Sequence, residues 1–319
     1  MAQHIVMDTD PGIDDSLAIL LALASPEVEL AAVSVTGGNC SLPCGVRNAL
    51  SVLALSGRSD LSVHAGVALP LLRPAFTAPE THGDTGLGYA RLPDSPVPPS
   101  DEHGVDMLIR EIMAQPGEVT LVALAPLTNV ALAIRKEPRI VEAVREVIIM
   151  GGALRVDGNT TPLAEFNFYV DPHAAQIVLT SGMPITLMPW DICKDVLLTQ
   201  ADVDQLLANG SPISQFVADA TRFYIEFHRE YFDYAGCSIC DPAALALALD
   251  GSLGRTEMVN IYVEHTSELT MGKSVADWGR VTGREPNVRA VVEFDSARFI
   301  RMFVERLERL VSKRSSSEG

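Results

Sequence analysis

The sequence predicts an α/β protein built as a single domain, with a mostly parallel, open central sheet flanked by helices. Short apolar runs precede helical patterns repeatedly along the chain, which is what successive strand–helix units produce. At 319 residues and 47% hydrophobic, the chain is long enough to bury a sizeable core. We expect this domain to cover residues 1–312 and residues 313–319 to form a disordered tail.

The individual elements follow from apolar runs and helical periodicity. Strands are expected at residues 5–7, 30–35, 119–124, 147–150, 185–188, 259–263 and 288–294. Helices are expected at residues 13–24, 46–55, 127–134, 211–234 and 296–311. The stretch 69–100 is rich in Pro, Ser and Gly, so we expect an irregular loop of the kind that often forms a lid or a binding surface.

Charge and cysteine content exclude several function classes. The chain has 24 Lys and Arg against 41 Asp and Glu, a net charge of −17, which would repel nucleic acid polymers and anionic membranes. No targeting pattern or long apolar run is present in the sequence, and we therefore predict a cytoplasmic protein. The five cysteines are an odd number and are expected to be free thiols. A zinc site at Cys237 and Cys240 would need a second ligand pair.

Four aspartates follow the first expected strand within eight residues: Asp8, Asp10, Asp14 and Asp15. Open α/β sheets bind their ligands at this edge, and carboxylates this close to one another repel unless a cation neutralises them. Oxygen ligands select a hard cation such as calcium or magnesium, and the spacing alone does not choose between them. The alternative is structural, because acidic residues also stabilise strand ends and helix N-termini.

The octet at residues 8–15, DTDPGIDD, resembles the signature of the inosine-uridine-preferring nucleoside hydrolase family. Further motifs resemble those of the family in order and approximate spacing: APLTN at 125–129, MGG at 150–152, GN at 158–159, AEFN at 164–167, DP at 171–172 and DPAA at 241–244. The resemblance spans residues 5 to about 290. It implies a Rossmann-like fold, bound calcium, and a homodimer or homotetramer.

The resemblance also implies roles for individual residues. The calcium ligands would be Asp10, Asp15, Asp241 and the backbone carbonyl of Leu124, although the glycine usual in the following motif is Ala125 here. Asp10 would also be the general base that takes a proton from water, and Asn167 would support the distorted sugar ring. Residues that would bind the ribose are Asp14, Asn39, Asn159, Glu165, Asn167 and Asp241.

Glu165 and Asn167 alternate with Phe166 and Phe168. Alternation of this kind is typical of an extended segment that turns alternate side chains to one side. We therefore expect both polar side chains to face the ribose from such a segment.

One departure from the family concerns the group that protonates the leaving base. Many members have a histidine immediately before the last calcium aspartate, where this chain has Cys240. A thiol is only a weak hydrogen-bond donor. The other candidates are His82, in a loop that resembles the family's active-site loop, and Tyr224, His228 or Tyr231 in the aromatic segment 223–231. His228 is also a candidate substrate-binding residue.

Together these observations predict an enzyme of nucleoside salvage and catabolism. It would hydrolyse the N-glycosidic bond of small-molecule ribonucleosides to free base and ribose in a calcium-dependent reaction. Three alternatives stay open: a ribonucleoside-binding protein that has lost turnover, a hydrolase of another N-ribosyl compound, and a magnesium-dependent phosphohydrolase with Asp8 and Asp10 as nucleophile and acid. The phosphohydrolase hypothesis gives no role to Asp14, Asp15 or Asn167.

Overall fold

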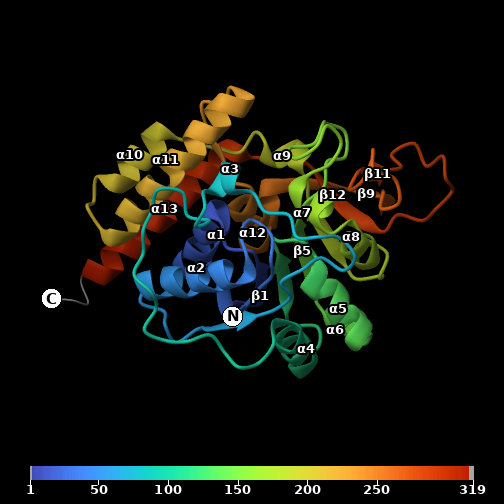
Figure 1. The fold of residues 1–319 in the computed structure, drawn as a ribbon, viewed down its shortest axis with the longest axis horizontal. Helices are drawn as coiled ribbons and strands as arrows, with labels where there is room; N and C mark the ends of the chain where they lie inside the picture. Colours follow the sequence, from blue (N-terminus) through green and yellow to red (C-terminus); the bar gives the residue numbers. More distant parts are fainter. Residues whose placement is uncertain (1, 316–319) are drawn as a thin grey trace.

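An eight-stranded sheet crosses the centre of the computed structural model, which describes residues 2–315 (Figure 1). The strand order is β3-β2-β1-β4-β5-β6-β12-β9, and every neighbouring pair is parallel except β12 and β9. The strands are β1 Gln3–Thr9, β2 Val28–Val35, β3 Ser62–Ala65, β4 Thr120–Ala123, β5 Glu146–Met150, β6 Ile185–Met188, β9 Gly254–Val259 and β12 Val288–Phe294. The predicted fold class, a mostly parallel sheet flanked by helices, is confirmed.

The order of winding reverses at β1. The chain runs from β1 outward to β2 and β3, then returns to place β4 on the other side of β1, where Asp8 pairs with Ala123. Loops leaving β1 and β4 therefore diverge at their carboxyl ends and open a crevice between them. The acidic octet begins at the end of β1, so it lies at this switch point.

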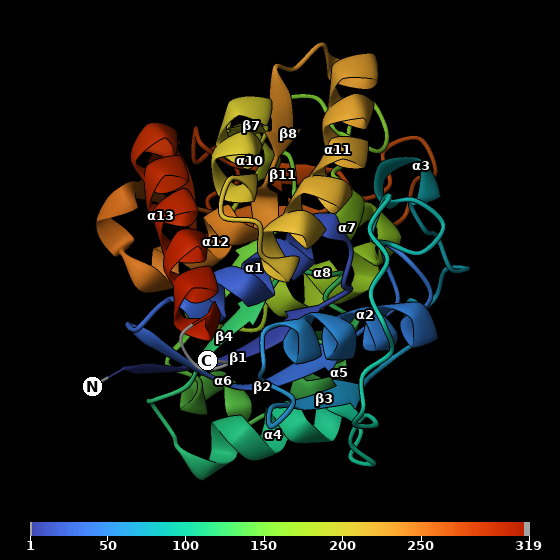
Figure 2. The ribbon, with the colours of Figure 1, turned by 90° about the vertical axis from the view of Figure 1, so that its left-hand side faces the viewer.

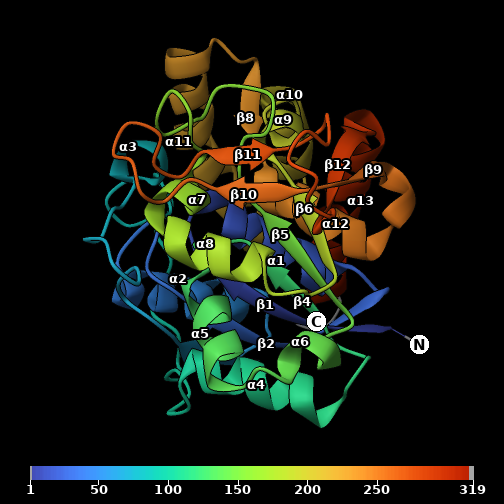
Figure 3. The same ribbon diagram turned by 90° about the vertical axis from the view of Figure 1, so that its right-hand side faces the viewer.

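Helices cover both faces of the sheet (Figures 2 and 3). In β1 the side chains of Ile5 and Met7 join one buried apolar cluster, whereas Val6 joins the other, because successive strand residues point to opposite faces. The first cluster includes side chains of α1 Ile13–Ala24, α2 Leu42–Leu55, α12 Cys240–Leu249 and α13 Ser296–Ser315. The second includes those of α4 Gly104–Ala114, α5 Thr128–Lys136 and α8 Pro172–Leu179.

Shorter elements complete the fold around the sheet. The strand pairs β7–β8 and β10–β11 are antiparallel, and α11 contacts the short helix α3 near the carboxyl end of β1 (Figure 2). No helix among residues 2–315 is long and apolar enough to cross a membrane. The bounds are α3 Pro79–His82, α6 Ile140–Ala143, α7 Phe166–Val170, α9 Trp190–Cys193, α10 Gln200–Leu207, α11 Pro212–Phe232, β7 Leu197–Thr199, β8 Gly236–Ser238, β10 Ile261–Val263, β11 Ser274–Ala276 and a 3₁₀ turn at Gly251–Leu253.

A predicted strand and the predicted tail differ from the structure, and the stretch 69–100, expected to be irregular, contains the short helix α3. The strand expected at 259–263 is divided between β9 and β10, because the Asn287 side chain pairs with both backbone groups of Ile261 at 2.8 and 2.9 Å and so replaces a neighbouring strand there. The tail was predicted to start at residue 313, but α13 continues to Ser315. Lys313 and Arg314 are good helix formers, which is consistent with this extension, and residues 316–319 lie outside the described residues.

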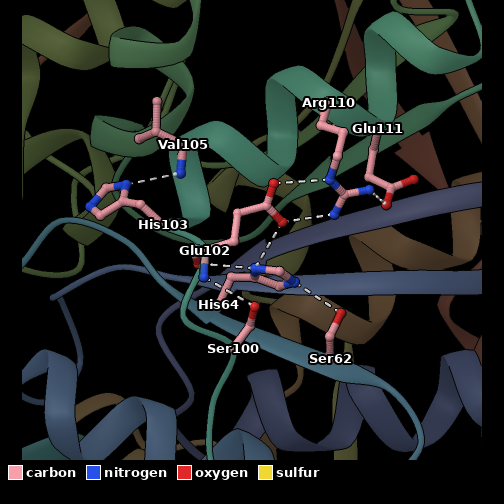
Figure 4. A network of polar contacts seen from close by, with 8 residues as sticks. All are labelled: Ser62, His64, Ser100, Glu102, His103, Val105, Arg110 and Glu111. Carbon is pink, nitrogen blue, oxygen red and sulfur yellow. Dashed lines mark hydrogen bonds and ion pairs between the residues drawn. The ribbon is translucent and has the colours of Figure 1, made fainter.

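A polar network joins β3 to α4 (Figure 4). His64 in β3 lies between the Ser62 hydroxyl, 2.9 Å from Nε2, and Glu102, whose carboxylate is 3.4 Å from Nδ1. Arg110 donates two hydrogen bonds to the Glu102 carboxylate, at 2.8 and 2.9 Å, and one to Glu111. Each charged group in this network therefore faces a partner of opposite charge or a polar group.

Candidate active site

The acidic octet forms a tight turn that ends β1 and begins α1. The Asp15 carboxylate accepts hydrogen bonds from the backbone N–H groups of Asp10 (3.1 Å) and Gly12 (3.0 Å), from the Asn39 side chain (2.8 Å) and from the Thr9 hydroxyl. Such side-chain acceptors satisfy the free N–H groups at a helix start. Asp15 therefore fixes the shape of the turn and is held rigidly by it.

Three carboxylates converge at this turn. Oxygens of Asp14, Asp15 and Asp241 lie within 4.8 Å of one another, and all three residues are buried. The backbone N–H groups of Cys240 and Asp241 hydrogen-bond to Asp14, which joins the starts of α1 and α12. Burial raises the pKa of Asp241 well above its usual range, and the negative charges of Asp14, Asp15 and Asp10 raise it further. For Asp14 the same two causes, burial and then Asp15, raise the pKa to about 8.

Asp10 lies beside this group of three but is not one of its members. Its Oδ2 accepts the backbone N–H of Asn39 at 2.7 Å, whereas Oδ1 is buried and has no hydrogen-bond partner among the described residues. Gly38 leaves room for the other oxygen, because a Cβ at residue 38 would collide with Asp10 Oδ2. The unpaired oxygen and the burial of Asp10 leave this carboxylate available to a ligand.

Asp8 has a different environment from the other three acids of the octet. Its Oδ1 accepts hydrogen bonds from the Ser34 hydroxyl and from Asn129 at 2.9 Å, and it is not among the residues that line the cavity described below. A phosphohydrolase of the type considered above would need Asp8 as its nucleophile. The hydrogen bonds from Ser34 in β2 and Asn129 in α5 hold the Asp8 carboxylate within the protein interior, which argues against that alternative.

Glu165 and Asn167 face the crevice from the start of a helix, so the expectation of an extended segment is wrong. Glu165 caps α7: its Oε1 accepts the N–H of Asn167 at 2.8 Å, and its Oε2 accepts the N–H of Gly152 at 2.7 Å. A carboxylate that binds the first free N–H groups favours a helix at this point. Burial raises the pKa of Glu165 to about 7.

Asn167 links the ends of two neighbouring strands. Its Nδ2 donates to the backbone carbonyls of Leu124, after β4, at 2.9 Å and Met150, at the end of β5, at 3.2 Å. Asn159 accepts the N–H of Phe166 at 2.9 Å and so holds the preceding loop against α7. Residues far apart in the sequence are thereby brought to one edge of the sheet.

These polar groups form one side of a cavity of about 300 Å³, and aromatic side chains form the other. The cavity brings together most of the site residues expected from the sequence: Asp14, Asn39, His82, Leu124, Asn159, Glu165, Asn167, His228, Cys240 and Asp241. Asp10 and Asp15 are not among the described residues that line the cavity, but both are hydrogen-bonded to Asn39, which is. A polar region with many hydroxyl-binding groups beside an aromatic wall suits a ligand with a sugar and a flat ring.

A family model described as inosine-uridine preferring nucleoside hydrolase matches residues 5–301. The chain belongs to this family. It is 38% identical to the pyrimidine-specific ribonucleoside hydrolase RihA of Salmonella arizonae, over 97% of this chain and 99% of the relative. Among solved structures it is similar to a purine-preferring ribonucleoside hydrolase from Gardnerella vaginalis (33% identity, TM-score 0.92) and to the plant nucleoside hydrolase PpNRh1 (34%, 0.91). Each similarity covers 97% of this chain and 99% of the other.

The protein is therefore a ribonucleoside hydrolase, an enzyme that cleaves N-glycosidic bonds. The predicted reaction class is confirmed by the family match and by these relatives together. The hydrolase fold is the one expected for the family, and the cavity lies where the sheet topology places a ligand.

His82 of the hydrolase has a defined tautomer. Its Nδ1 accepts the backbone N–H of Ile13 at 3.1 Å, so the proton of the neutral ring is on Nε2. Burial lowers the pKa of His82 to about 4, and the ring is therefore neutral at pH 7. Gly12 permits this approach, because a Cβ there would lie 2.6 Å from His82 Nδ1 and 2.8 Å from Asn39 Nδ2.

His228 and Cys240 are the other candidates for contact with the base. His228 Nδ1 lies 2.9 Å from the carbonyl of Tyr224, which makes Nδ1 the protonated nitrogen of a neutral ring, and burial lowers its pKa to about 4. Cys240 is buried beside Cys193, and burial raises its pKa well above the usual range. Both side chains line the cavity.

Sequence reasoning missed part of the aromatic wall. Phe76, Trp190 and Phe232 line the cavity, yet none of them was a candidate. Trp190 follows β6 by two residues, and a position just beyond the carboxyl end of a parallel strand was a usable signal. Phe76 lies in the 69–100 loop, which also contributes Glu80, Thr81 and His82 to the cavity.

Proposed function

We propose that the hydrolase depends on calcium held by Asp10, Asp15, Asp241 and the Leu124 carbonyl. The support is the unpaired, buried Oδ1 of Asp10 together with the convergence of Asp14, Asp15 and Asp241. A set of carboxylate and carbonyl oxygens suits a hard cation of flexible coordination geometry. Calcium held there would supply positive charge that orients ribose hydroxyls and lowers the pKa of a water molecule.

Ribose binding is the task of the polar side of the cavity. Asp14, Asn39, Asn159, Glu165 and Asn167 offer carboxylate and amide groups to the sugar hydroxyls, and Asp241 is shared between sugar and cation. Such a buried polar site discriminates strongly against analogues that lack those hydroxyls. Loss of the base develops positive charge on the sugar ring, which the surrounding carboxylates stabilise.

Asp10 acts as the general base. Its Oδ1 has no competing hydrogen bond among the described residues, which leaves it free to accept a proton from water. Asn167 supports the distorted sugar ring from the ends of β4 and β5.

His82 donates the hydrogen bond that the departing base requires. Its Nε2 carries the proton because Nδ1 is occupied by the Ile13 N–H, and its ring stands 5.4 Å from that of Tyr224 in the aromatic wall. Cys240 is a weaker candidate for two reasons. Burial disfavours the thiolate that would remain after proton transfer to the base, and a thiol forms only weak hydrogen bonds. Cys240 therefore serves as a wall of the base pocket.

Pyrimidine ribonucleosides are the proposed preferred substrates. The RihA relative is named pyrimidine-specific and is 38% identical, and the base would enter between Trp190, Tyr224 and Phe232 in a cavity of about 300 Å³. The similar structure from Gardnerella vaginalis is named purine-preferring and is 33% identical. Hydrolysis of purine and pyrimidine ribonucleosides must therefore be compared directly.

The test is release of free base and reducing ribose from inosine, adenosine, guanosine, uridine and cytidine, each with added calcium or with chelator. Release that disappears with chelator and in Asp10→Ala supports the proposal, and Glu102→Gln, in the network of Figure 4, is the control. Magnesium that replaces calcium at equal efficiency would overturn the choice of cation. Thermal protection by ribosides without base release would instead support the binding protein that has lost turnover.

Two further expectations stay predictions. A cytoplasmic location and a homodimer or homotetramer follow from the sequence and the family resemblance respectively. Light scattering of the purified protein would measure the oligomeric state.

A further inference from the structure

A pair of cysteines lies at the N-terminus of α2, beside the active site. Cys40 precedes the helix and is buried, whereas Cys44 is in its first turn and is half-buried. The two thiols lie close enough for each to shift the pKa of the other. Neither belongs to the described residues that line the cavity, so the hydrolase reaction gives this pair no role.

The surroundings of Cys44 favour its thiolate. The Arg47 guanidinium is 3.7 Å from the Cys44 sulfur, and the sulfur lies in the first turn of a 14-residue helix, where the helix dipole stabilises negative charge. The neighbouring Cys40 thiol, followed by the Arg47 charge, lowers the pKa of Cys44 to about 6. In its protonated form Cys44 donates to the Thr85 carbonyl at 3.2 Å.

The other three thiols have the opposite character. Cys193, Cys237 and Cys240 are buried, and burial raises the pKa of both Cys237 and Cys240. Since the thiolate is the reactive form and access is also needed, reactivity should concentrate on Cys44.

We propose that Cys44 is an oxidation site for hydrogen peroxide and that Cys40 is its resolving thiol. The Cys44 thiolate attacks one peroxide oxygen, the O–O bond breaks, and hydroxide leaves and is protonated to water. Sulfur is thereby oxidised to sulfenic acid while the peroxide is reduced. The Cys40 sulfur then loses its proton and attacks the Cys44 sulfur, and the displaced hydroxide takes that proton as a second water, which leaves a disulfide.

This disulfide would affect the active site through Asn39. Asn39 is adjacent to Cys40 and holds Asp10 through its backbone N–H at 2.7 Å and Asp15 through its side chain at 2.8 Å. A disulfide requires a sulfur separation of about 2.05 Å and a narrow dihedral range. The Cys40 sulfur donates a hydrogen bond to the Pro11 carbonyl at 3.9 Å. To form the disulfide, Cys40 would have to move away from this carbonyl and toward α2, and Asn39 would move with it.

Peptide mass mapping after limited hydrogen peroxide treatment of the calcium-loaded protein tests the chemistry. Arg47 is the first Lys or Arg of the chain, so trypsin releases both cysteines on one peptide. That peptide should lose two hydrogens, while Cys193, Cys237 and Cys240 remain free to react with an alkylating reagent after unfolding. Oxidation of those three before or equally with Cys44, or no loss of hydrogens from the peptide, would overturn the proposal.

Three variants separate the roles of the pair. Cys40→Ser should stop the reaction at a sulfenic acid on Cys44, which dimedone traps, and Cys44→Ser should leave Cys40 reduced. Arg47→Met should slow alkylation of Cys44 about tenfold because the thiolate loses its adjacent charge. Cys237→Ser is the matched control, since this buried thiol has no part in the pair.

An activity measurement tests the link to catalysis and rests on the proposed function. Oxidation should lower riboside hydrolysis about tenfold or more, as expected for displacement of a residue that orients metal ligands, and dithiothreitol should restore it. Cys44→Ser should resist the loss. A disulfide without any loss of hydrolysis would overturn the link through Asn39.

Failure of the proposed function can be told apart from failure of this inference. An unoxidised protein without activity would refute the proposed function, yet the mass measurement would still decide whether the disulfide forms.

Discussion

The network at β3 and the acidic cluster at the end of β1 are both built from ionisable side chains, but their charges are balanced differently. In the network, hydrogen bonds from Arg110 lower the pKa of Glu102 (Figure 4). In the cluster, burial and neighbouring carboxylates raise the pKa of Asp241 and Asp10. The network is complete within the protein, whereas the cluster holds an excess of negative charge that a bound cation would relieve.

The difference indicates which group of acids stabilises the fold and which is maintained for function. Ion pairs such as Glu102 and Arg110 add modest stability. Converging buried carboxylates destabilise the metal-free protein, which is a common property of active sites. Substitutions in the acidic cluster should therefore lower activity and raise the stability of the metal-free protein. Substitutions in the network should lower stability and leave activity unchanged.

Asp241→Asn should produce the largest effect. Loss of this carboxylate removes a predicted ligand of both cation and ribose, and we expect kcat/KM to fall by roughly 10²–10⁴-fold. In chelator the variant should melt at a higher temperature than the wild type, because the cost of burying this carboxylate beside Asp10, Asp14 and Asp15 is gone. A lower melting temperature in chelator would contradict this account of the cluster.

Glu165→Gln should change how stability depends on pH. The pKa of Glu165 is raised from 4.5 to about 7, so the folded state retains a proton that the unfolded state loses. Its contribution is fully present below pH 4.5 and is lost as pH rises through about 7, a change of roughly 3 kcal/mol. Thermal melts from pH 4 to 8 should show a weaker decline with pH for the variant.

Glu102 should change the pH dependence of stability in the direction opposite to Glu165. Its pKa is lowered, so its contribution is present above its unfolded value of 4.5 and is lost as pH falls through the lower folded value. If Glu102→Gln and Glu165→Gln flattened the same limb of the pH profile, the assigned directions would be wrong.

His82→Gln should lower kcat about 10²-fold, because the leaving base loses its hydrogen-bond donor in the transition state. KM and the calcium-induced rise in melting temperature should change little, since His82 is not a proposed metal ligand. His228→Gln is the matched control on the facing helix. A larger loss of kcat in the control would transfer the donor role to His228.

Glu102→Gln should produce the smallest effect. It removes an exposed bidentate pair, and we expect a loss of less than about 1 kcal/mol in the free energy of unfolding with unchanged hydrolysis. Urea unfolding monitored by circular dichroism would measure it. A loss of activity in this variant would show that the two regions are coupled.

The sequence was most informative where local chemistry and topology agree. The octet lies at a strand end, so its place at the sheet edge followed from the alternation of elements, and α1 begins at Ile13 as predicted. The shape of the Glu165 segment was not predictable from alternation alone, because the cap depends on the N–H of Gly152, which comes from another part of the chain. Trp190 and Phe232 were missed for a similar reason: packing in three dimensions assembles the aromatic wall.

The contact between Asp14 and the start of α12 has a consequence for biosynthesis. Asp14 receives the backbone N–H groups of Cys240 and Asp241, so the first strand–helix unit and a segment late in the chain must meet before the acidic cluster exists. Contacts between distant segments form late because closing long loops costs entropy. A nascent chain still lacking α12 therefore cannot form the proposed catalytic centre, and we expect hydrolysis to begin only after most of the protein has left the ribosome.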